Sequence, residues 1–190
     1  MLFRRVFRNC FTYPSPRKLR EIMQMSLIER ESPATIKTIW EEYHAEKVQN
    51  IAMLLETEVY LNLKSRLKEC NMFMLPIKRE NGHFMLVSQS QDHSLLFTSM
   101  ENYKAKQIFA DPMFIFTFFE ELQDTKGLVL GRGDIIHAQL TRSEAGDLMK
   151  NFLMYYLTSD LYEDFVQPFN FDSTRFDYNK YCKQLDIQKN

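Results

Sequence analysis

The spacing of hydrophobic residues changes twice along the chain and divides the sequence into three parts. In the first part, up to about residue 70, apolar residues recur every three or four positions, which is typical of amphipathic helices. This spacing predicts helices at 19–27, 33–48 and 57–70. The middle one has two start signals, Ser32 as N-cap and Pro33 in the first turn. Their expected buried residues are Leu19, Ile22, Met23 and Leu27; Ile36, Ile39, Trp40, Tyr43 and Val48; and Val59, Tyr60, Leu63 and Leu67.

In the middle part the spacing shifts toward two, the period of strands. It predicts strands at 72–78, 84–90, 94–99, 113–118, 128–131 and 135–140, with short helices at 100–107 and 120–126. Asn81-Gly82 predicts a tight hairpin between the first two strands, because both residues tolerate positive φ. Pro76 indicates that the first strand is at an edge or bulged, because proline cannot donate to a ladder.

The last part is helical again, at 143–157, about 160–166 and 173–185. Helices at both ends, with adjacent hairpin strands between them, predict an α+β fold. We expect a mainly antiparallel sheet of about five or six strands, flanked by the N-terminal and C-terminal helices.

The first twenty residues are much more basic than the rest. They hold six Lys and Arg side chains and no acid, whereas the remaining residues carry 18 basic and 25 acidic side chains. Arginines interleaved with apolar residues are typical of a mitochondrial presequence. We therefore expect residues 1–16 to be a presequence, residues 17–190 to form one domain, and the protein to reside in the matrix. A basic arm for RNA is the alternative, but the acidic body repels nucleic acid, so no such partner is expected.

The cysteine spacing bears on the redox compartment of the protein, and its hydropathy on whether it spans a membrane. Cys10, Cys70 and Cys182 are far apart and form no C-x-x-C pair, which suits a reducing compartment. The apolar stretch Met113–Phe119 is broken by Thr117 and is far shorter than the roughly 18 residues of a membrane span, so none is expected.

The sequence contains no established catalytic or cofactor motif. The histidines at 44, 83, 93 and 137 form neither H-E-x-x-H nor an i, i+4 pair, so no metal is expected. Gly127, Gly131 and Gly133 miss both phosphate-loop patterns, which favours turn and strand-end glycines. We expect no cofactor and no enzyme activity.

Aromatic residues and methionine are abundant, with 16 Phe, 9 Tyr, 1 Trp and 11 Met. Period two in the run from Met113 places Phe114, Phe116 and Phe118 on one face. The favoured interpretation is a central strand buried on both faces, and the alternative is an apolar face kept for a partner. Trp40 and Tyr43 carry the same two interpretations.

Five segments, in this order and spacing, carry a family resemblance. They are Trp40–Lys47 (W-x-x-Y-H-x-x-K), Met72–Ile77 (F-x-L-P) with the following hairpin to Phe84, Leu96–Thr98 with Tyr103, Lys126–Gly133 (K-G-x-V-L-x-R-G), and Val166, Phe169-Asn170 and Phe176–Tyr178. With them the chain resembles the mitochondrial ATP synthase F(1) assembly factor 1 family, over about residues 18–180.

The resemblance implies a chaperone that binds free F(1) beta subunits and shields their apolar interface until the alpha subunit replaces it. It also implies a curved sheet surrounded by helices, and we expect a monomer when the protein is free. The candidate partner-binding residues are Phe114, Phe116, Phe118, Trp40, Tyr43 and His44. The competing hypothesis is a matrix enzyme of unknown reaction that uses His44 with a nearby carboxylate such as Glu41.

Overall fold

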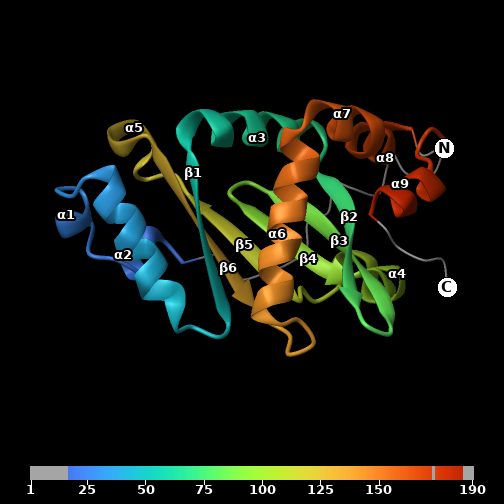
Figure 1. Ribbon diagram of the computed structural model, residues 1–190, viewed down its shortest axis with the longest axis horizontal. Coiled ribbons are helices and arrows are strands. Elements are labelled where there is room, and N and C mark those ends of the chain that lie inside the picture. The colour runs from blue at the N-terminus through green and yellow to red at the C-terminus, as the bar shows by residue number, and fades with distance from the viewer. Residues whose placement is uncertain (1–16, 173, 186–190) are drawn as a thin grey trace.

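A six-stranded antiparallel sheet forms the centre of the computed structural model, which describes residues 17–172 and 174–185 (Figure 1). The strands are β1 (Asn50–Glu56), β2 (Met72–Arg79), β3 (Gly82–Gln91), β4 (Ser94–Ser99), β5 (Phe114–Phe119) and β6 (Leu128–Ile135). Their order is β1-β6-β5-β4-β3-β2, and the sheet is curled. Strands β2 to β6 therefore form a meander, and β1 returns to pair with β6, with Asn50 opposite Asp134.

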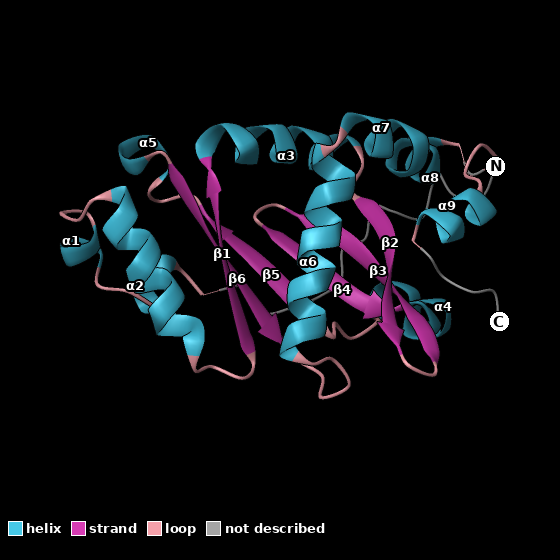
Figure 2. Ribbon diagram, in the orientation of Figure 1, coloured by secondary structure: helices cyan, strands magenta, loops and turns pink. Residues whose placement is uncertain are grey.

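Helices surround this sheet and cover both of its faces. Those before β2 are α1 (Met25–Ile28), α2 (Pro33–Ala45) and α3 (Thr57–Glu69), with a 3₁₀ turn at Leu19–Glu21. Within the sheet segment are α4 (Met100–Lys106), a 3₁₀ turn at Gln107–Phe109 and α5 (Gln123–Lys126). The last are α6 (Arg142–Leu157), α7 (Ser159–Leu161), a π-helical turn at Tyr162–Val166, α8 (Gln167–Phe171) and α9 (Tyr178–Gln184). Figure 2 shows α6 lying across the strands and α7 to α9 gathered at the β2 end.

The two faces of the sheet belong to different hydrophobic clusters. Phe114, Phe116 and Phe118 of β5 face α6 and α3 in the larger cluster. On the opposite face, Phe119 and Leu130 pack against α2. Every residue of β5 is buried, because the strand lies inside the sheet and is covered on both sides.

Most of the predicted architecture is confirmed. The fold is α+β: an antiparallel sheet whose strands are preceded and followed in the sequence by helices. Strand β2, which contains Pro76, lies at an edge of the sheet. The interpretation of a central strand buried on both faces is also confirmed. The hairpin is present, but Arg79 pairs with Gly82, so its two central residues are Glu80 and Asn81.

Two strand predictions are wrong, although the number of strands is right. Residues 128–131 and 135–140 do not form two strands: β6 runs unbroken from Leu128 to Ile135 and ends there. Strand β1, at residues 50–56, was not expected at all. Its Ala-Met-Leu-Leu sequence favours helix intrinsically and shows no alternation, because the strand is only partly covered on each face.

Several residues expected in the core are instead exposed. Tyr43, Val48 and Val59 have 42%, 78% and 37% of their surface exposed, and Leu27 has 55%. The first helix is also broken into a 3₁₀ turn and α1, so its stripe does not persist. Helix α2 ends at Ala45, which leaves Val48 in the connection to β1.

The domain prediction assigns residues 1–16 to a presequence and residues 17–190 to a single domain. The presequence predicted at 1–16 lies outside the described residues, and so does residue 173 at the start of the last predicted helix. None of the described helices has the length and apolar character that a bilayer span requires.

Candidate functional site

Helix α2 carries three of the six predicted partner-binding residues. The Ser32 hydroxyl caps its first turn by accepting the Thr35 N–H at 3.1 Å, and Pro33 occupies the first helical position. Ile36, Trp40 and His44 follow at four-residue intervals, so they share the face that packs on the sheet. All three are buried, and their common role is to attach α2 to the outer face of the sheet.

Trp40 is fixed by both packing and a hydrogen bond. Its indole Nε1 donates to the Gly131 carbonyl of β6 at 3.1 Å, and its ring meets the edge of Phe119 with the centroids 5.9 Å apart. The side chain has no exposed surface. Trp40 therefore acts as a core residue in this conformation.

His44 is held neutral inside the fold. Its Nδ1–H donates to the Trp40 carbonyl at 2.9 Å, and Nε2 has no hydrogen-bond partner among the described residues. Burial lowers the pKa of His44, and the positive charge of Arg132 lowers it further. Glu41, the carboxylate of the enzyme hypothesis, is exposed while His44 is fully buried, so solvent reaches only one of the two groups.

Tyr43 differs from the other five candidates because its ring reaches the surface. The Lys47 Nζ lies 3.1 Å from the centroid of this ring, a cation–π contact. The Lys47 ammonium also lowers the pKa of the Tyr43 hydroxyl. Tyr43 thus presents an aromatic surface and a positive charge together.

Phe114, Phe116 and Phe118 are at most 4% exposed. The rings of Phe114 and Phe116 lie directly over Gly133 and Gly131, where a Cβ would come within 2.5 Å of ring carbons. These two glycines are therefore strand-interior residues that make room for phenylalanine, which corrects the turn and strand-end interpretation. Of the three glycines singled out in the sequence, Gly127 alone is a turn glycine, with φ +68° at the end of α5.

A network that the sequence did not reveal lies between α3 and the β3–β4 turn. The Glu120 carboxylate accepts hydrogen bonds from Lys64 Nζ at 2.7 and 2.9 Å, from His93 Nδ1 at 3.0 Å and from the Tyr60 hydroxyl. Burial opposes ionisation of Glu120, but these donors outweigh it and lower the pKa of the carboxyl. The four residues come from three segments that are far apart in the sequence, so no sequence motif predicts the network.

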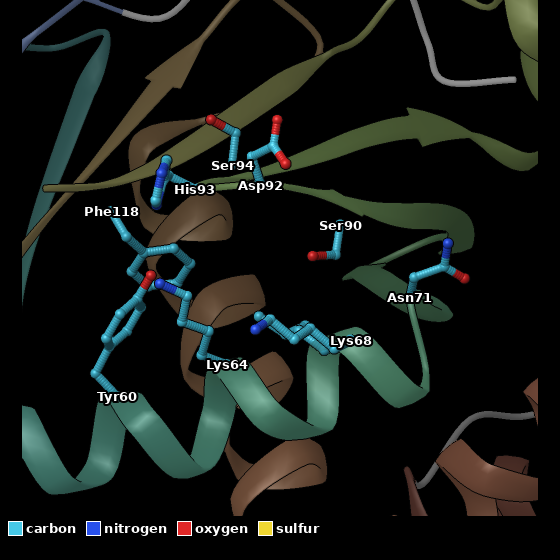
Figure 3. A pocket seen from close by; sticks show the side chains of 10 residues that line it. Tyr60, Lys64, Lys68, Asn71, Ser90, Asp92, His93, Ser94 and Phe118 are labelled. Atoms are coloured by element: carbon cyan, nitrogen blue, oxygen red, sulfur yellow. The ribbon is translucent and has the colours of Figure 1, made fainter. Parts of the chain in front are cut away.

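A cavity of roughly 260 Å³ adjoins this network. Figure 3 shows Lys64 reaching from α3 toward the side of the cavity that carries His93, with Lys68 beside it on the same helix and Phe118 lining one wall. The described residues bring no group of three metal-ligating side chains together anywhere in the fold. The hydrogen bonds of Tyr60 and Lys64 to Glu120, together with the Lys64–Glu120 ion pair, tie α3 to the segment that follows β5.

The chain is similar to known proteins over most of its length. The family model described as "ATP11 protein" matches residues 9–182. Curated relatives from Homo sapiens, Mus musculus and Danio rerio, each named "ATP synthase mitochondrial F1 complex assembly factor 1", are 24%, 23% and 23% identical over 176 residues. The alignments cover 92% of this chain and 53%, 54% and 58% of the relatives. The chain thus spans little more than half the length of the curated relatives that it matches.

Proposed function

Because the chain belongs to the ATP11 protein family, we propose that it acts in assembly of the mitochondrial ATP synthase F1 sector. In this proposal it binds free beta subunits and shields their apolar interface until the alpha subunit replaces it. The observation that carries the proposal is the family match over residues 9–182, which agrees with the resemblance read from the sequence.

The physical need for such a protein is clear. Obligate subunit interfaces are large and apolar, and an unassembled subunit that exposes one aggregates. Alpha can displace the chaperone by binding the same surface more tightly, so release needs no nucleotide hydrolysis. We accordingly propose a binding protein that is monomeric when free.

The environments of His44 and Glu120 support binding over catalysis. His44 is buried and neutral, and Glu120 is held ionised by three donors. Tyr43, with its exposed ring beside Lys47, is the candidate of the original six that is best placed for partner contact. Trp40 supports α2 from inside, whereas the three phenylalanines are buried on the other face of the sheet, under α3 and α6.

The proposed location is the mitochondrial matrix. Its support is the name of the relatives and the six basic, acid-free residues among the first twenty. Replacement of Arg4, Arg5 and Arg8 by Glu should block import, and normal import of that variant would contradict the presequence proposal.

The function is tested with purified components. Unassembled beta subunit is warmed alone, with the chain, or with the same amount of an unrelated acidic protein, and aggregation is followed by light scattering. We expect suppression by the chain at near-stoichiometric ratios, and its reversal when alpha subunit is added. Persistent aggregation, with no complex on a sizing column, would refute the proposal; turnover of a matrix metabolite would favour the enzyme hypothesis.

A further inference from the structure

The sheet has two edge strands, β1 and β2, and they differ in how far their outward main-chain groups are paired. In antiparallel strands, alternate residues direct both their N–H and C=O groups away from the neighbour. An edge strand therefore carries a row of unpaired groups, which proteins normally block.

The β2 edge is blocked at Met72 and, in part, at Met74 and Pro76. The Ser90 N–H bonds to the Asn71 carbonyl, which fixes the register so that Met72, Met74, Pro76 and Lys78 point outward. The Asn170 side chain from α8 bonds to both the N–H and the C=O of Met72, at 3.2 and 2.6 Å. The Tyr181 hydroxyl of α9 donates to the Met74 carbonyl. Pro76 has no N–H to offer, and Lys78 adds a charge.

The β1 edge is open at its centre. Two hydrogen bonds show which way the main-chain groups of β1 point. The Thr57 N–H donates to the Gly127 carbonyl at 3.1 Å, and the Ile135 N–H donates to the Gln49 carbonyl at 2.9 Å. The main-chain groups of the odd-numbered residues of β1 therefore face β6. The even residues therefore point outward. At one end, the Asn50 N–H donates to Lys47 and its carbonyl accepts from Arg142.

Ala52 and Leu54 are the next two outward residues. Within residues 17–172 and 174–185, neither their N–H nor their C=O groups have a hydrogen-bond partner. Four main-chain groups are thus unpaired, on a strand with no proline and no charge between Asn50 and Glu56.

The side chains beside this open edge are apolar on both faces of the sheet. Ala52 and Leu54 are partly exposed and pack against the α2 cluster, while Met53 and Leu55 are partly exposed against the larger cluster. A strand added here would gain main-chain bonds at Ala52 and Leu54, and apolar contact on both of its faces. This is the arrangement used in strand-addition recognition.

We infer that the open edge of β1 binds an extended, uncharged, apolar segment of the unassembled F1 beta subunit, which joins the sheet as a further strand. The inference deepens the proposed function and rests on it. A second copy of this chain fits less well. Antiparallel pairing of two β1 strands would bring two copies of α2 together on one face, and the end of α2 exposes three glutamates, Glu41, Glu42 and Glu46, beside Lys37 and Lys47.

The test uses Ala52→Pro in the full chain and measures its affinity for purified, unassembled beta subunit. The Ala52 N–H points away from β6, so proline removes no bond of the sheet but blocks the edge. Lys78→Pro is the matched control, because it makes the same change at an outward position of β2. We expect Ala52→Pro to bind at least about tenfold more weakly than the wild type, and Lys78→Pro to bind like the wild type.

Amide hydrogen exchange on the wild-type chain gives a second readout that needs no variant. The Ala52 and Leu54 amides should exchange rapidly in the free protein and become protected when beta subunit is added. This result decides the matter even if Ala52→Pro fails to fold.

The remaining outcomes separate the two proposals. If wild type and Ala52→Pro bind beta subunit equally, or the two amides stay unprotected in the complex, the edge is not the docking site and the assembly function stands. If the wild type binds no beta subunit, the proposed function itself fails. A dimer of the free chain that Ala52→Pro abolishes would assign the edge to a second copy and overturn the inference.

Discussion

Gly133→Ala should destabilise the fold, because the position has no room for a methyl group. A Cβ there would lie 2.5 Å from two ring carbons of Phe114 and 2.6 Å from Cγ1 of Ile51. Ordinary carbon contacts are about 3.5–4.0 Å, so both neighbours would have to move by roughly 1 Å. The Phe114 ring cannot easily do so, since it is fully buried and packs on the ring of Phe97 with the centroids 5.5 Å apart.

The expected loss follows from two opposing terms. Overpacking of a close-packed core costs about 1–3 kcal/mol, and three contacts this short place Gly133→Ala near the upper end. Alanine recovers roughly 0.5–1 kcal/mol, because glycine loses more backbone entropy on folding. The net decrease in the free energy of unfolding should be about 2 kcal/mol. For a chain of this size it lowers Tm by about 4–8 °C.

Urea unfolding followed by circular dichroism measures this change, with an unchanged m-value showing that the two states remain comparable. Gly146→Ala is the matched control: its Cβ would meet nothing within 4 Å, and within α6 it should stabilise the protein by about 0.5–1 kcal/mol. Phe114→Leu in the Gly133→Ala background should recover part of the loss. The reasoning is wrong if Gly133→Ala is as stable as the wild type, or if Phe114→Leu rescues nothing.

Three further predictions concern the interior of the fold and the β2 edge. Trp40→Phe removes the hydrogen bond to Gly131 and leaves a small void, so thermal unfolding should show a loss of about 1–2 kcal/mol; an unchanged Tm would contradict the assignment of Trp40 to the core. Because burial lowers the pKa of His44, the unfolded chain binds a proton below about pH 6.5 that the folded chain resists. The free energy of unfolding should therefore fall from pH 6.5 to 5.5, by at most about 1 kcal/mol, and His44→Gln should flatten this decrease in urea titrations. Asn170→Ala removes both hydrogen bonds to the main chain of Met72, so urea unfolding should show a loss of about 1–2 kcal/mol; an unchanged free energy of unfolding would contradict the role of Asn170 in holding α8 on β2.

Prediction from the sequence succeeded where one pattern determines one structure. The predicted stripe that contains Ile36 and Trp40 defines the buried face of a helix, and the run Phe114–Phe119, apolar except for Thr117, defines a strand covered on both sides. It failed for β1, whose residues favour helix, because pairing with β6 from a distant part of the chain overrides local preference. It also divided β6 at Gly131 and Gly133, since the reason for these glycines lies on the neighbouring strand, in the rings of Phe116 and Phe114.

Much of the candidate site was beyond the reach of sequence reasoning for a similar reason. Glu120, Lys64 and His93 come together only when α3 crosses the sheet above the β3–β4 turn. No regular spacing in the sequence predicts that these three side chains contact one another. Val48 was expected to be buried because the helical stripe was extended past Ala45, where α2 ends. Tyr43 lies within α2, but beside the face that Ile36, Trp40 and His44 bury, so its ring reaches the surface.

The position of β1 next to β6 has a consequence for how the chain folds. Strands β2 to β6 each pair with a neighbour in sequence, so short loops close and the meander can grow step by step. Strand β1 has its partner at the far end of that meander, where Asn50 meets Asp134, and this is the sheet pairing of highest contact order. Strand β1 therefore has no partner strand to pair with until β6 has joined the sheet. A chain released in the N-to-C direction would hold β1 waiting for the longest time, and completion of the β1–β6 ladder would report that the whole sheet is finished.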